Sequence, residues 1–249
     1  MISVFMKRTN EFSIISEIST EDSSTWQERI FLTFDIDWAH DEIIEDVLSL
    51  CESYSVPITI FATHKTNVLF DSTLKFQKIE IGIHPNFNPL LKLQSNDKDF
   101  EMICCDLKNI FPDAKSVRSH SLCFGSLIQT IYEKLNITHD SSLIIPYQKN
   151  EFPLFPWKMW DALIRVPYLF CDYVTAMTTD AAIIKIASRT GLKVFDFHPI
   201  HVFLNTESLE RYERTRPIHQ NPKELIKHRY EGYGTRNRLI ELLELTKNQ

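Results

Sequence analysis

The sequence predicts an α/β fold in which parallel strands curve into a distorted (β/α) barrel of about seven strands. Short apolar runs alternate with stretches of helical spacing along most of the chain, as in a parallel sheet covered by helices. The runs number about seven within roughly 200 residues, which is fewer than an eightfold barrel needs. Several of these runs also end in polar residues. The strand ends are therefore the first place to look for a functional site.

The expected strands are buried runs rich in β-branched and aromatic residues. The first, at residues 29–34 (RIFLTF), is apolar and is followed directly by an acidic residue. A strand that is covered by helices on both faces has this character, because neither face needs polar side chains. The other expected strands lie at residues 57–62, 79–83, 115–118, 163–168 and 192–197.

The expected helices carry apolar residues on one side. Asp41 is expected to cap a helix whose buried side contains Ile43, Ile44, Val47, Leu48 and Cys51. Further helices are expected at residues 100–111, 124–135, 179–188 and 235–246, the last carrying Leu239, Leu242, Leu243 and Leu245 to cover one side of the barrel. Residues 150–160 (NEFPLFPWKMW) are expected to form either a packed lid or part of a substrate groove.

Length and composition predict a single domain over residues 1–249, with a core at about 30–205 and a helical C-terminal extension at 206–249. The net charge of −6 disfavours nucleic acid and anionic membranes as partners. No run approaches the ~20 apolar residues of a membrane helix, and the first 28 residues lack the apolar core of a secretory signal. We therefore expect a cytoplasmic protein whose five cysteines are reduced thiols. The oligomeric state stays open.

Four strand ends carry polar side chains that differ sharply from the apolar runs before them. In parallel α/β folds the carboxyl ends of the strands meet at one edge, where catalytic groups collect. The sequence places there Asp35 and Asp37 (TFDIDWAHD), His84 (EIGIHPNFNP), Arg118 and His120 (VRSHS), and His198 and His201 (FDFHPIH).

The pair Asp35 and Asp37 favours a metal. Residues two apart on an extended strand point the same way, and two crowded carboxylates resist joint ionisation unless a cation lies between them. A divalent metal would allow one Asp to act as a ligand and the other as a base. Taken alone, such a pair is more often a helix cap and a surface carboxylate, and a lone histidine after a strand, such as His84, is more often a hydrogen-bonded loop residue than a metal ligand.

In this order the motifs resemble those of the polysaccharide deacetylase family (NodB homology, carbohydrate esterase family 4). TFDID is similar to the first family motif, TFDDG, and EIGIHPNFNP is similar to the second, EIGNHxxxHP, with His84 on its first histidine. VRSHS falls where the arginine-containing motif is expected, and FDFHPIH resembles the last motif. The resemblance extends from about Phe31 to His201.

The resemblance implies a distorted barrel that hydrolyses the N-acetyl group of a sugar with a divalent metal, Zn²⁺ being the first choice. It implies that Asp35 is the general base, that Asp37 and His84 are metal ligands, and that His198 is the general acid. The expected substrate is an N-acetylated sugar or glycan precursor, such as a nucleotide- or lipid-linked intermediate of a surface polysaccharide.

Further roles follow from the same resemblance. Arg118 would hold or tune the base, and Asp172 (PYLFCDY) would orient either His198 or Arg118. Asn88 and Trp38 are expected to contact substrate.

One departure affects the metal site. The second metal histidine of the family falls four residues after the first, and that position is Asn88 here. Asparagine is a poor zinc ligand, so we expect His120 to supply the third ligand, with His201 as the next candidate. Asn88 also keeps open a second hypothesis, a carbohydrate-binding relative without the metal. A glycosyltransferase is a third hypothesis, but it explains only the two aspartates.

Overall fold

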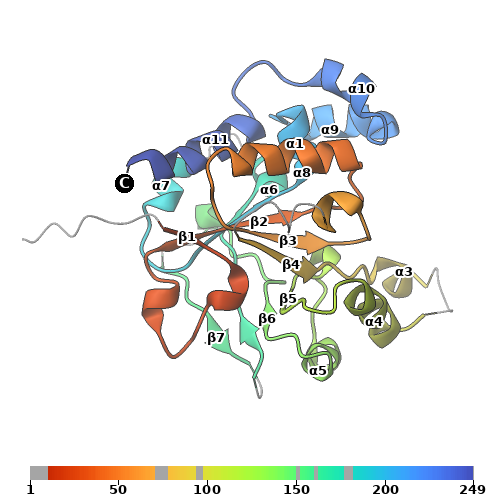
Figure 1. Ribbon diagram of the computed structural model, residues 1–249, viewed down its shortest axis with the longest axis vertical. Helices are drawn as coiled ribbons and strands as arrows, with labels where there is room; N and C mark the ends of the chain where they lie inside the picture. The colour runs from red at the N-terminus through yellow and green to blue at the C-terminus, as the bar shows by residue number, and fades with distance from the viewer. Residues whose placement is uncertain are drawn as a thin grey trace, which may run out of the picture.

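A curved sheet of mostly parallel strands forms the centre of the computed structural model (Figure 1), which describes residues 11–70, 78–93, 98–149, 152–159, 162–176 and 182–248. The strands are β1 (Glu11–Ser13), β2 (Arg29–Asp35), β3 (Ile58–Ala62), β4 (Ile79–Ile83), β5 (Ser116–Val117), β6 (His139–Asp140), β7 (Trp157–Lys158), β8 (Ile164–Arg165), β9 (Phe170–Cys171) and β10 (Lys193–Phe197).

The sheet is open and curls into a half-barrel. Its strand order is β7-β8-β6-β5-β4-β3-β2-β10-β9, with β1 beside β2, and every pair within the described residues is parallel except β7 with β8. The predicted α/β distorted barrel is therefore confirmed. The sheet has 10 strands where about seven were expected: β1, β6, β7 and β9 were not predicted, because strands of two or three residues are too short to show a sequence period.

The long strands are the buried ones. All of β3 and β10 is buried, and β2 is buried from Ile30 onwards. Their parallel pairing places residues 35, 62, 83, 117 and 197 at one edge of the sheet. The polar residues that follow these positions in the sequence consequently lie near one another.

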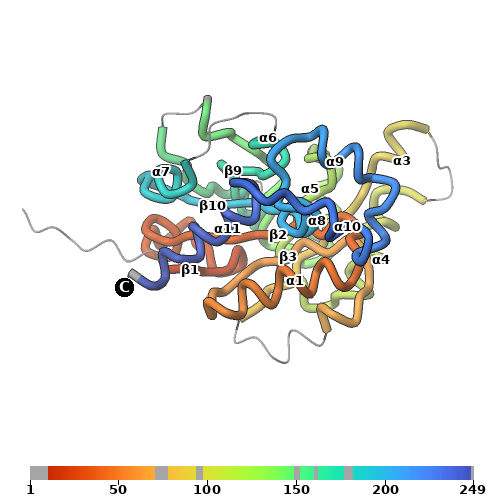
Figure 2. Tube along the Cα trace, turned by 90° about the horizontal axis from the view of Figure 1, so that it is seen from above, coloured from red at the N-terminus to blue at the C-terminus, as the bar shows by residue number. Residues whose placement is uncertain are grey.

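The helices are α1 (Asp41–Glu52), α3 (Asn88–Leu91), α4 (Phe100–Ile110), α5 (Ser126–Lys134), α6 (Asp172–Ala176), α7 (Ile183–Ala187), α8 (Pro199–Leu204), α9 (Leu209–Thr215), α10 (Pro222–Leu225) and α11 (Thr235–Glu244). Helices α1, α8 and α11 pack together above the sheet in Figure 1, and Figure 2 shows this layer from above. Leu239, Leu242 and Leu243 of α11 are fully buried, as expected, whereas Leu245 lies after the helix and is half-buried.

Several predicted boundaries were wrong. His40, and not Asp41, caps α1: its Nδ1 accepts the backbone N–H of Glu42 at 3.2 Å, because His40 keeps an extended backbone. The strand predicted at 163–168 pairs with β6 only at Ile164–Arg165. The helix predicted at 124–135 begins at Ser126, after the extended Gly125. Of the helix predicted at 179–188, residues 179–181 lie outside the described residues.

The described part of the aromatic segment, residues 152–159, packs against the start of β10. The Leu192 N–H donates to the Leu154 carbonyl at 2.8 Å. Gly191 has φ +90°, and a Cβ there would lie 2.6 Å from the same carbonyl oxygen, so only glycine fits. None of residues 152–159 lines the cleft described below. The described part of the segment therefore packs on the start of β10 and does not line that cleft, and residues 150, 151 and 160 lie outside the described residues.

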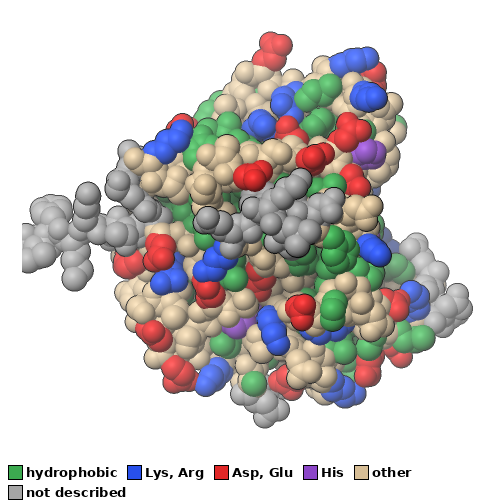
Figure 3. Space-filling model, viewed as in Figure 1, with side chains coloured by type: hydrophobic (Ala, Val, Ile, Leu, Met, Phe, Trp, Pro, Cys, Tyr) green, Lys and Arg blue, Asp and Glu red, His purple; other side chains and the backbone are tan. Residues whose placement is uncertain are grey.

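The face seen in Figure 3 carries Lys, Arg, Asp and Glu side chains that are interspersed over its surface. This mixed pattern agrees with the small net charge and shows no broad basic surface on that face. None of the helices in the described ranges has both the length and the apolar character needed to cross a bilayer.

Candidate active site

A cleft of about 480 Å³ opens at the carboxyl ends of the strands. Its walls come from the loops after β2, β4, β5 and β10, together with α6 and the segment that contains α9. Six of the polar residues that line it are Asp35, Asp37, His84, His120, Asp196 and His198. Five of these six were predicted from the strand ends.

Asp35 and Asp37 reach the cleft from different backbone conformations. Asp35 is the last residue of β2, whereas Asp37 lies in a turn with φ 39°, and the next residue, Trp38, has φ 56°. The turn closes where the Ala39 N–H donates to the Ile36 carbonyl at 2.7 Å. The expectation that both residues lie on one extended strand was therefore wrong. Aspartate tolerates the left-handed region better than most residues, which suits it to this turn.

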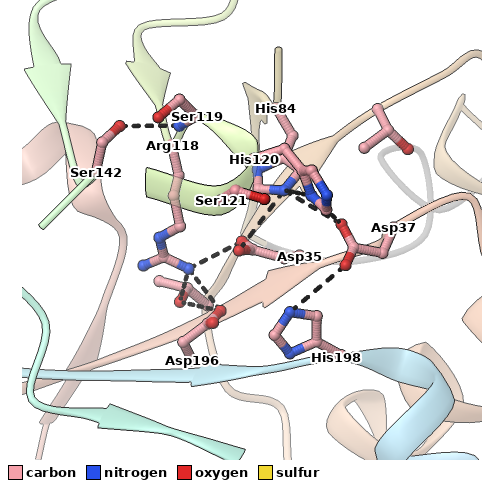
Figure 4. A network of polar contacts seen from close by, with 12 residues as sticks. Asp35, Asp37, His84, Arg118, Ser119, His120, Ser121, Ser142, Asp196 and His198 are labelled. Atoms are coloured by element: carbon pink, nitrogen blue, oxygen red, sulfur yellow. Dashed lines mark hydrogen bonds and ion pairs between the residues drawn. The ribbon is translucent and has the colours of Figure 1, made fainter. Parts of the chain in front are cut away.

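Three donor atoms form a small triangle in the cleft (Figure 4). Asp37 Oδ1 lies 3.0 Å from His120 Nδ1 and 3.2 Å from His84 Nε2, and the two nitrogens are 3.3 Å apart. Ligands at ~2.0–2.2 Å around a tetrahedral zinc ion are themselves about 3.3–3.5 Å apart. The carboxylate and imidazole donors are also of the types that zinc accepts. The residues present thus fit a divalent metal.

The electrostatics of the triangle also suit a cation. Burial would raise the pKa of Asp37, but His120 and His84 hold it well below its usual range. Burial opposes protonation of His84, yet Asp35 and Asp37 raise its pKa. A positive charge is therefore favoured between these groups. The buried Nδ1 of His84 has no hydrogen-bond partner among the described residues, so packing and not a second hydrogen bond fixes this ring.

Arg118 lies beneath the cleft and joins two carboxylates. Its Nη1 donates to Asp35 Oδ1 at 2.9 Å and to Asp196 Oδ1 at 2.5 Å, and all three side chains are buried. Its guanidinium carbon lies 4.5 Å from the ring centre of Phe61 and 4.3 Å from that of Tyr168. The predicted contact between Arg118 and the proposed base is present, and it leaves Oδ2 of Asp35 on the side of His84, 3.8 Å from its Nε2.

Asp196 was missed by the sequence reasoning. It lies inside β10, where apolar residues surround it, and the search for polar residues considered only strand ends. Burial, together with the charge of Asp35, raises the pKa of Asp196, and Arg118 opposes that rise. The signal that would have found it is an acidic residue at an interior position of an otherwise apolar strand.

His198 is held by Asp172. His198 Nδ1 lies 2.7 Å from Asp172 Oδ1, and its backbone N–H donates to Asp172 Oδ2 at 2.7 Å. Burial would lower the pKa of His198, but Asp172 raises it well above its ordinary value. Of the two partners expected for Asp172, the structure shows His198. The ring therefore turns its Nε2 toward Asp37 Oδ2, 3.7 Å away, and carries a proton that it can give up.

Three predicted residues lie outside the triangle. Asn88 donates from Nδ2 to Ser121 Oγ at 2.9 Å and does not line the cleft. Trp38 does not line it either, and packs edge-on against His120 with the ring centres 5.2 Å apart. Both residues thus contact the loop of His120, and their contact with substrate stays a prediction. His201 lines the cleft next to His198, and its Nδ1 lies 3.1 Å from Thr206 Oγ1.

Buried His201 makes stability depend on pH. Burial lowers its pKa from 6.5 to about 4. Between these values the unfolded chain binds a proton that the folded protein does not, so the free energy of unfolding decreases as the pH falls through this window. The full loss is about 3 kcal/mol. We expect metal-free wild type to lose about 2–3 kcal/mol more than His201→Gln between pH 7 and 4.5 in urea unfolding. Equal losses in the two proteins would contradict the assignment.

The comparisons with known proteins agree with the geometry. A family model described as WbmS-like polysaccharide deacetylase matches residues 32–216. A Bordetella bronchiseptica protein, WbmS, assigned as a polysaccharide deacetylase involved in O-antigen biosynthesis, has a crystal structure that is similar to this chain. The identity is 38%, the TM-score 0.88, and the match covers 94% of this chain and 98% of that one.

A Mycobacterium smegmatis structure assigned as a polysaccharide deacetylase is 14% identical, with a TM-score of 0.50 and 94% of each chain covered; it supports the fold alone. A search of curated proteins gave no significant match.

Proposed function

Because the chain belongs to the WbmS-like polysaccharide deacetylase family, we propose that it is a metal-dependent hydrolase that removes an N-acetyl group from a sugar. The observation that carries the proposal is the triangle of Asp37, His84 and His120, with Asp35 and His198 beside it. The substrate that we propose is an N-acetylated precursor of a surface polysaccharide. The assignment of the similar Bordetella protein to O-antigen biosynthesis supports this choice.

The metal would be held by Asp37 Oδ1, His84 Nε2 and His120 Nδ1. When bound, such an ion polarises an amide carbonyl and makes a nearby water molecule more acidic. The donor set alone leaves zinc and other first-row divalent ions open, and zinc is our proposal because it accepts this mixture of oxygen and nitrogen donors.

The protein side chains supply the proton transfers. Asp35 accepts a proton from the attacking water as oxygen bonds to the acetyl carbon, and Arg118 fixes this carboxylate through its other oxygen. His198 then donates the proton on Nε2 to the sugar nitrogen as the carbon–nitrogen bond breaks, while Asp172 keeps Nδ1 protonated. Acetate and a free amino sugar result. Each of these acid–base roles is typically worth about 10²–10⁴ in rate.

The hypothesis of a metal-free binding relative depended on Asn88. In the structure the nitrogen of His120 lies in the triangle, so the loss of a histidine at position 88 does not reduce the number of donors. The glycosyltransferase hypothesis leaves His84, His120 and His198 without a role, and no observation favours it.

The direct test is acetate release. Purified protein, freed of metal by a chelator, is expected to release acetate from N-acetylated sugar nucleotides or glycan intermediates only after about one equivalent of Zn²⁺, Co²⁺ or Ni²⁺ is restored. Release that persists unchanged in the metal-free protein would contradict metal dependence. Sugar binding without acetate release across a broad panel would instead favour a binding protein.

The third ligand is tested by matched variants. We expect His120→Ala to weaken zinc binding as much as His84→Ala does, by more than the ~10–100-fold typical of losing a hydrogen bond that supports a ligand. Asn88→Ala removes only a contact to Ser121 and should change zinc affinity by less than about tenfold. Competition with a chelating dye measures all three affinities. If His120→Ala binds zinc as tightly as wild type, His120 is not a ligand.

A further inference from the structure

A segment that carries none of the recognised motifs forms one wall of the cleft. Helix α9 and the following turn, Arg216–Ile218, contribute Tyr212, Glu213 and Arg216 to its lining. We propose that Tyr212 binds the substrate by donating a hydrogen bond from its hydroxyl to the sugar ring that carries the N-acetyl group. This proposal rests on the proposed deacetylase function and names the residue that recognises the sugar.

The ring of Tyr212 is fixed by two histidines. Its centre lies 4.7 Å from the ring centre of His201 and 4.9 Å from that of His219. Each histidine is itself anchored, His201 to Thr206 Oγ1 and His219 to Thr215 Oγ1, both at 3.1 Å. A tyrosine that is held in this way loses little conformational entropy when a ligand arrives. The position of the hydroxyl is thus set before the substrate binds.

The hydroxyl of Tyr212 is available to a ligand. It makes no hydrogen bond to another described residue, and it is not among the buried polar atoms without a partner. Tyr212 is half-buried and lines the cleft, and the charges of Asp37 and His198 act on its hydroxyl, as expected for a group that faces that space. Burial and the charge of Asp37 raise its pKa, so the group stays protonated and can donate. By contrast, the hydroxyl of Tyr233 is already paired with Glu241 at 2.7 Å.

The position of Tyr212 indicates that it would contact the sugar ring of the substrate and not the acetyl group. The departing sugar nitrogen must face His198, so the sugar ring lies on that side of the cleft. Tyr212 lies on the same side, because His201 packs edge-on against His198, with ring centres 5.7 Å apart, and Tyr212 packs on His201. Farther out, Glu213 and Arg216 form an exposed ion pair at 3.3 Å. Sugar hydroxyls are suitable acceptors for the phenol.

The variant Tyr212→Phe tests the proposal because it keeps the ring and removes only the hydroxyl. We expect KM for acetate release to rise about 3- to 10-fold, the usual effect of one lost neutral hydrogen bond. A contact made equally in the ground state and the transition state leaves kcat within about twofold of wild type. Zinc affinity should be unchanged. The matched control is Tyr233→Phe. This variant also removes a tyrosine hydroxyl from the C-terminal part of the chain, but Tyr233 does not line the cleft, so KM should stay unchanged.

Equilibrium binding separates this proposal from the proposed function. UDP-N-acetylglucosamine and N,N′-diacetylchitobiose are titrated into zinc-loaded protein with and without Tyr212→Phe. A 3- to 10-fold weaker binding of either probe supports Tyr212 even if no acetate is released, in which case the deacetylase function alone fails. Unchanged KM and unchanged binding overturn the role of Tyr212 while acetate release stands. A fall in kcat with unchanged KM also overturns it, and absence of binding by wild type overturns both proposals.

Discussion

Replacing Asp35 by asparagine is expected to lower acetate release by about 10²–10⁴-fold while the protein stays folded and keeps its metal. The amide is nearly the size of the carboxylate, and its oxygen can still accept the hydrogen bond from Arg118 Nη1. It cannot take a proton from water at neutral pH. Asp196 remains as a counter-charge for Arg118, so the melting temperature should change little. Turnover, zinc content and thermal unfolding are measured on the same preparation.

Asp196→Asn is the matched control for this result. It also removes one carboxylate from Arg118 Nη1, but it leaves the proposed base intact. We therefore expect a much smaller loss of turnover than for Asp35→Asn. If Asp35→Asn releases acetate at the wild-type rate, Asp35 is not the base. If the two variants lose activity equally, the loss reflects the charge balance around Arg118 and not proton transfer.

Replacing Arg118 by methionine is expected to lower the free energy of unfolding by about 3–5 kcal/mol, since it leaves two buried carboxylates without their cation. Burial already raises the pKa of Asp196, and losing the charge of Arg118 would raise it further. The folded variant then binds a proton that the unfolded chain does not, so its deficit should shrink as the pH falls. Urea unfolding of metal-free protein at pH 8 and pH 5.5 measures both effects.

Two further variants control for packing. Arg118→Lys keeps the positive charge but loses the planar guanidinium group. Its loss of free energy of unfolding should therefore be smaller than that of Arg118→Met. Adding Asp196→Asn to Arg118→Met should restore part of the stability, because one uncompensated charge disappears. A deficit below about 1 kcal/mol, or one that is independent of pH, would show that the guanidinium contributes mainly through its packing on Phe61 and Tyr168.

The long strands could be predicted because a buried parallel strand leaves an apolar run in the sequence. The strands β2, β3, β4 and β10 accordingly lie within one residue of the predicted limits. The strands β1, β6, β7 and β9 have only two or three residues and no period to detect, since their pairing depends on the strands beside them. The cap of α1 and the first residue of α5 were predicted wrongly, whereas α4 and α11 begin as predicted and end one or two residues early.

The residues of the candidate site also differ in whether the sequence alone could predict them. His84 was predictable because it directly follows a strand. The approach of His120 depends on a turn in which Ser121 and Leu122 both have φ 57°, which no spacing in the sequence indicates. Asp196 was hidden inside an apolar strand, and Tyr212 lies on a helix that carries no recognised motif. Local patterns thus indicated the loops that meet and the approach of Asp37, His84 and His120, whereas Asp196 and Tyr212 were found only in the folded chain.

If His120 is the third ligand, as we propose, the metal would connect segments that are far apart in the sequence. Two ligands four residues apart would clasp a single short loop. Here His84 and His120 are 36 residues apart, and Asp37 and His120 are 83 apart. An ion bound by all three would tie the ends of β2, β4 and β5 together as a cross-link. Closing long loops restricts the unfolded chain more than closing short ones. The ion would therefore stabilise the folded strand ends of the half-barrel, in addition to its role in catalysis.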